Sequence, residues 1–149
     1  MKPIEQISKS MRPPATALLI ALTGLVVMVS IMALTGDPIF TRDAAALCTT
    51  AFVGAGMAGF ATFWCFGHER GLGIVYAILG GIGATLLGAF LAGLLFFGLV
   101  EQAFADILAG SLVASLFIAS MIVTSPVAIA WVLGMLGTHA AARYLRRCA

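Results

Sequence analysis

Residues 72–100 read LGIVYAILGGIGATLLGAFLAGLLFFGLV, an apolar run that contains no charged side chain. A helix needs about 20 apolar residues to cross a membrane, because each residue adds about 1.5 Å and the hydrocarbon core is about 30 Å thick. The run exceeds that length. It therefore predicts a transmembrane helix that tilts, kinks or projects from the bilayer.

The same pattern occurs three more times along the chain. We expect further spans at about 15–35, 44–66 and 107–138, with a kink in the last where the Pro126 ring removes a backbone hydrogen bond. Only 9% of the 149 residues are charged, against roughly 25% in an average soluble domain. These features predict an all-α membrane protein, a four-transmembrane-helix bundle in one integral membrane domain (1–149). They exclude a soluble enzyme and a nucleic-acid-binding protein.

Positive charge lies on one side of the expected bundle. Seven of the eight Lys and Arg residues flank the spans at the two termini and in the 67–71 turn, and only Arg42 lies on the other side. By the positive-inside rule, both termini and this turn are cytoplasmic. We expect the bacterial inner (plasma) membrane. An interfacial aromatic belt on the cytoplasmic side is expected to contain Trp64, Tyr76, Trp131 and Tyr144.

Small residues form two adjoining rows on the 72–100 helix, because residues four apart share a helix face. We call these eight residues the glycine strip: Gly80, Ala84, Gly88 and Ala92 in the first row, and Gly81, Thr85, Ala89 and Gly93 in the second. In lipid, small residues let two helix backbones approach closely. The strip can pack against the chain's own helices, form an interface with a partner or a second copy, or line a pore. We expect a helix-packing or partner interface, because a four-helix bundle needs only one such row.

The predicted spans carry few groups able to do chemistry. They have no ionisable residue at mid-depth, where ion or proton carriers place one. Their polar side chains are Ser and Thr hydroxyls, which commonly bond to their own helix. We also find no catalytic motif. The sequence therefore predicts a protein that is not an enzyme and has no cofactor.

One group of side chains fits this interpretation less well. Cys65 and His68 have the Cys-x-x-His spacing that can serve a metal, and His139 is expected on the same side of the membrane. The set lacks a second Cys pair, and the two histidines lie too near the surface for a haem buried between helices. We predict no metal site, and Cys65, His68 and His139 are speculative ligands only.

Three functions follow from these features. The leading hypothesis is a non-catalytic accessory or structural subunit that packs against other membrane protein subunits, or copies of itself, in the lipid bilayer. The alternative is a homo-oligomeric channel or small-solute carrier, such as a small membrane subunit of a multi-component transporter. A third hypothesis is a metal- or haem-binding redox protein. No nucleic-acid partner is expected.

Overall fold

The computed structural model describes residues 3–68, 72–100 and 103–147. In these ranges the chain forms five α-helices and one short 3₁₀ helix, and it forms no strand. They are α1 (Pro3–Thr35), α2 (Arg42–Thr62), η1 (Phe63–Cys65), α3 (Gly73–Val100), α4 (Phe104–Thr124) and α5 (Val127–Arg147). The all-helical prediction is confirmed.

Four segments are long and apolar enough to cross a membrane, as the sequence predicts. They are Pro13–Thr35, Arg42–Cys65, Gly73–Leu99 and Phe104–Thr124. The first three agree with the expected spans. The fourth ends at Thr124, well short of the expected boundary at residue 138, because the helix is interrupted after Thr124.

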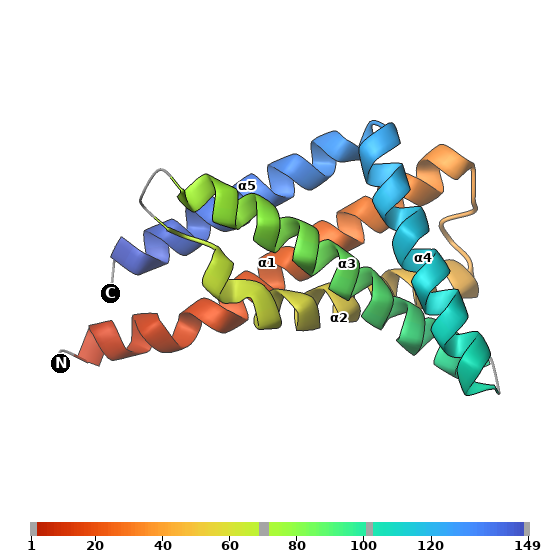
Figure 1. The fold of residues 1–149 in the computed structure, drawn as a ribbon, viewed down its shortest axis with the longest axis horizontal. Coiled ribbons are helices and arrows are strands. Elements are labelled where there is room, and N and C mark those ends of the chain that lie inside the picture. The colour runs from red at the N-terminus through yellow and green to blue at the C-terminus, as the bar shows by residue number, and fades with distance from the viewer. Residues whose placement is uncertain (1–2, 69–71, 101–102, 148–149) are drawn as a thin grey trace.

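The first three helices run back and forth beside one another (Figure 1). Gly24 of α1 lies against Ala55 of α2, and Gly54 of α2 lies against Gly88 and Ala92 of α3. Both chain termini lie at one end of the bundle, which we call the terminal end (Figure 1). The opposite end, where α1 meets α2 and α3 meets α4, is called the far end.

The expected fourth span is two helices rather than one kinked helix. The α4 helix ends at Thr124, and Ser125 is extended (φ −131°, ψ 167°), which is the conformation that a residue before proline prefers. The Ser125 N–H and its hydroxyl both donate to the Met121 carbonyl. The Val127 N–H donates to Ser125 Oγ at 3.3 Å. These bonds provide partners for the Met121 carbonyl and for the N–H groups of Ser125 and Val127 at the break.

The break gives α4 and α5 different directions. The α4 helix crosses the bundle steeply at the far end, whereas α5 returns towards the terminal end (Figure 1). One end of α4 is fixed where Gly110 lies against the Phe97 ring of α3. The other end is fixed where Ile122 joins a buried cluster with Val27 and Ile31 of α1. The fourth place in the bundle, beside α1, is therefore taken by α5.

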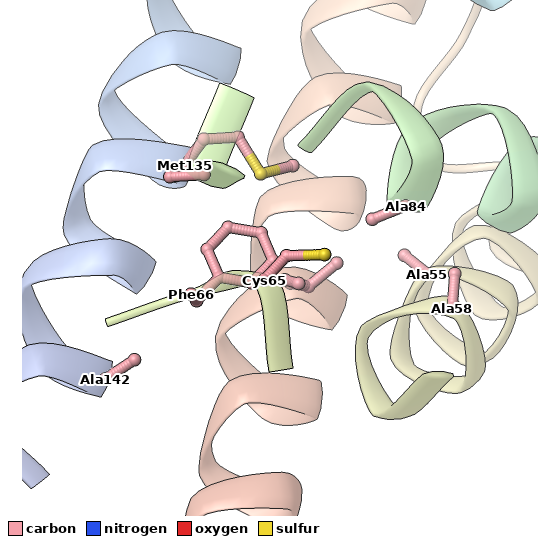
Figure 2. Packing of buried hydrophobic residues seen from close by; sticks show 9 residues of the cluster. Ala55, Ala58, Cys65, Phe66, Ala84, Met135 and Ala142 are labelled. Carbon is pink, nitrogen blue, oxygen red and sulfur yellow. The ribbon is translucent and has the colours of Figure 1, made fainter. Parts of the chain in front are cut away.

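A second buried cluster fills the terminal half of the bundle. Its centre is Phe66, which is fully buried directly after η1. Figure 2 shows Phe66 and Cys65 between α5, which contributes Met135 and Ala142, and a group of small side chains on α2 and α3. Because alanines line this side, α2 and α3 approach closely, and one aromatic ring fills the remaining space.

Candidate functional site

The first row of the glycine strip packs against α2 and η1. A Cβ placed on Gly80 would lie 2.4 Å from Cys65 Cβ, and one on Gly88 would lie 3.0 Å from Ala55 Cα. Ala84 and Ala92 are buried in the same contact. These distances leave no room for a larger side chain at either glycine.

The second row faces α4 and α5 instead. A Cβ on Gly93 would lie 2.8 Å from Ser111 Cα of α4, and one on Gly81 would lie 3.3 Å from the Met135 side chain of α5. Each row thus has its own neighbours within the chain. The double row matches the five α-helices that the described residues form, in place of the four that we predicted.

A cavity remains where the two rows, α1 and the α4–α5 break come together. The empty space here is about 490 Å³, which includes open space outside the mouth of the cavity. Its walls come from all five α-helices and are mostly aliphatic. The lining residues include Thr23, Gly24 and Met28 of α1, Ala89 of α3 and Ile118 of α4.

Three polar side chains line the cavity wall, and each already donates a hydrogen bond within the protein. The Trp131 Nε1–H donates to Thr85 Oγ1 at 2.7 Å, and the Thr85 hydroxyl donates to the Gly81 carbonyl at 2.8 Å. The Thr23 hydroxyl donates to the Leu19 carbonyl at 2.9 Å. An apolar cavity whose polar groups are already satisfied stays dry and takes apolar ligands. This cavity is the candidate functional site.

No pattern in the sequence predicts this cavity. Trp131 was expected in the interfacial belt, but its ring packs against both buried clusters and lines the cavity. The sequence offers one indication of it: Trp131 lies inside the apolar run 127–138 and not at its end. An indole N–H that deep needs an acceptor, and Thr85 provides one.

A second group of polar side chains lies at the terminal end. The Gly67 N–H donates to His139 Nδ1 at 3.2 Å. His68 Nε2 lies 2.9 Å from the Trp64 carbonyl oxygen, and Arg146 Nη1 lies 3.4 Å from His68 Nδ1. Because a carbonyl only accepts, His68 carries its proton on Nε2 and accepts from Arg146 at Nδ1. These contacts tie the end of α5 to the segment after η1.

The charge around His139 favours this arrangement. Burial and, after it, the positive charge of the nearby Arg143 guanidinium lower the pKa of His139. His139 lies beyond the apolar part of α5, and its neutral form keeps Nδ1 available as an acceptor for Gly67.

The three speculative metal ligands do not come together. The Cys65 side chain lies against Gly80, both nitrogens of His68 have contacts, and Nδ1 of His139 faces Gly67. Within the described ranges, no group of three or more His, Cys, Asp and Glu side chains is placed to hold a metal ion. Both Cys48 and Cys65 are free thiols.

Comparison with protein families, curated proteins and solved structures found no match.

Proposed function

We propose that the chain is an integral inner-membrane protein with both termini in the cytoplasm. At the terminal end, α5 carries Arg143, Arg146 and Arg147, whereas the far end carries Asp37, Asp43 and Asp106 beside a single Arg42. Both termini lie at the positive end (Figure 1). Cytoplasmic segments of membrane proteins carry this excess of Lys and Arg.

In this placement, α4 and α5 share the fourth crossing. The apolar part of α5, 127–138, has twelve residues, or about 18 Å of helix, which is too short to cross about 30 Å of hydrocarbon. Its first residue, Val127, packs beside Val27 and Ile31, in the far half of α1. The α5 segment thus covers the cytoplasmic half of the crossing, and the oblique α4 covers the other half.

Cysteine labelling tests this orientation. In a variant with Cys48, Cys65 and Cys148 replaced by alanine, we introduce Phe40→Cys at the far end or Tyr144→Cys near the end of α5. Both positions are exposed. A membrane-impermeant maleimide is expected to label the first in intact cells, and the second only after the membrane is permeabilised. Labelling of Tyr144→Cys in intact cells would contradict the orientation.

Within that membrane, the chain acts as a non-catalytic accessory subunit that packs against partner helices. The outward face of α4 supports this proposal. Only 17% of the apolar segment of α4 is buried, against 28% to 33% for the other three candidate spans. The exposed side chains of this α4 face are Leu112, Val113, Leu116, Phe117 and Val123. The glycine strip is occupied within the chain, so the partner contact is assigned to the α4 face instead.

Photo-crosslinking tests the accessory role. A photoreactive residue at Leu116, on the α4 face, is expected to capture the protein that co-purifies in a gently extracted particle. The same residue at Leu79 is the matched control, because Leu79 is also an exposed leucine, on α3. A particle that contains only copies of this chain, with no heterologous crosslink from Leu116, would contradict the accessory role.

The broken crossing favours a second candidate, the homo-oligomeric carrier. Discontinuous transmembrane helices form the substrate sites of many transporters, and this break adjoins the cavity through Ile122 and Trp131. The Ser111 and Ser115 hydroxyls of α4 bond to their own helix, so they provide no polar path within one chain. A carrier of this design would move an apolar solute, and flux into liposomes that contain only this protein would reveal it.

A further inference from the structure

We propose that the cavity between the glycine strip, α1 and the α4–α5 break is a binding site for one hydrocarbon chain of a membrane phospholipid. This inference goes beyond the accessory role and depends only on the membrane placement above. The headgroup stays outside the protein, and a single acyl chain enters the bundle.

The depth of the cavity points to the bilayer as the source of the ligand. Its walls are formed by residues 20–31 of α1, 51–55 of α2 and 84–92 of α3, which lie inside three of the candidate spans. A mouth at this depth opens onto lipid tails. Leaving the cavity empty forfeits dispersion contacts along its walls, and the bilayer supplies chains that restore them.

The polarity of the wall selects an apolar occupant. The hydrogens of Trp131, Thr85 and Thr23 are already donated within the protein. A polar headgroup would gain no donor from these side chains and would lose its hydration. Methylene groups lose nothing by the transfer from the bilayer, so a lipid tail fits this wall.

The cavity has a closed end and an open side. At the terminal end, Ile20, Ala84 and Met135 are buried and belong to the Phe66 cluster. On the other side, Met28 and Ile118 are only half-buried. We therefore place the chain so that it enters past Met28 and Ile118, passes Trp131, and ends against the buried Ile20, Ala84 and Met135.

Fluorescence quenching tests this site, because Trp131 lines it. With Trp64→Phe, Trp131 is the only tryptophan. The protein is reconstituted in vesicles of phosphatidylcholine that carries bromine atoms along its acyl chains. Trp131 fluorescence is expected to be quenched relative to the same vesicles without bromine. A brominated free fatty acid, added to unbrominated vesicles, shows whether a free chain reaches the same site.

Filling the cavity supplies the decisive comparison. Ala89→Leu adds side chain at the buried wall, and most of the bromine quenching is expected to be lost. Ala109→Leu is the matched control, because Ala109 lies on an exposed part of α4, and it should leave the quenching unchanged. Should Ala89→Leu fail to fold, Ile118→Phe, which narrows the mouth, is expected to give the same loss.

A further variant separates this proposal from the membrane placement. In a background without Trp64 and Trp131, Phe117→Trp reports on the exposed α4 face. If Phe117→Trp is quenched and Trp131 is not, or if Trp131 quenching is unchanged by Ala89→Leu and Ile118→Phe, the acyl-chain site is wrong. If neither tryptophan is quenched, the membrane placement is wrong as well.

Discussion

Replacing Gly67 with alanine is expected to destabilise the fold by about 2–5 kcal/mol, the sum of a backbone penalty and a packing penalty. Gly67 has φ +80°, and a Cβ there would lie 2.7 Å from the Ala142 carbonyl carbon and 2.8 Å from its oxygen. The left-handed backbone is costly for any side chain, and α5 must also move away. That movement breaks the bond between the Gly67 N–H and His139 Nδ1.

The control for this prediction is Gly36→Ala, between α1 and α2. Gly36 has a similar φ of +77°, but nothing lies within 4 Å of its added Cβ. It should therefore lose only the backbone part, about 1–2 kcal/mol. Unfolding of the purified protein in mixed detergent measures both losses. If the two variants are equally destabilised, the contact between Gly67 and α5 contributes nothing.

The second large effect is expected at the contact between α2 and α3. A Cβ on Gly54 would lie 2.6 Å from both the Ala92 nitrogen and the Gly88 oxygen. Both are backbone atoms of α3, so no side-chain rotation relieves the overlap. We expect Gly54→Ala to lower the free energy of unfolding by about 3 kcal/mol, the upper part of the usual range for overpacking.

The matched control is Gly83→Ala on α3, for which we expect a stabilised protein. No atom lies within 4 Å of a Cβ on Gly83 of α3, so Gly83→Ala adds only helix propensity and is expected to stabilise by up to about 1 kcal/mol. The same unfolding experiment measures both variants. A stabilised Gly54→Ala protein would show that α2 and α3 do not approach as closely as described.

The positions of the first three apolar segments could be predicted because one physical requirement fixes them. A helix that crosses hydrocarbon needs a minimum apolar length, and charges mark where it stops. The first apolar segment ends before the turn at Gly36, and the second ends before the polar segment after Gly67, as this rule predicts. For α1, α2 and α3, apolar length and charge therefore predict the elements well.

The arrangement of α4 and α5 could not be predicted in the same way. Pro126 indicates that a helix is interrupted, but the direction taken afterwards depends on the backbone angles of Ser125 and on what each helix finds to pack against. Hydropathy favours α4 over α5 as a membrane span, yet α5 lies beside α1. The contacts of Gly134 with Thr23 and of Trp131 with Thr85 hold α5 in this position. Both contacts join residues that are far apart in the chain.

The glycine strip shows a similar limit. A spacing of four predicts which face of a helix admits another backbone, but it does not identify the neighbour, because glycine and alanine accept almost any surface. The first row meets α2 and the second meets α4 and α5. The cavity arises where the helices that pack against the two rows leave a space between them. No residue pattern in the sequence therefore predicts it.

The pairing of α1 with α5 joins two helices that lie far apart in the chain. Proteins generally fold from the N-terminus as the ribosome extends them, so the surface of α1 at Thr23 stays uncovered until Gly134 has been synthesised. A nascent chain that stops before Val127 lacks Trp131 and Met135, which line the cavity, and leaves that side of α1 and α3 uncovered. Closure of the core therefore waits for the synthesis of α5, however early the helices before it are made.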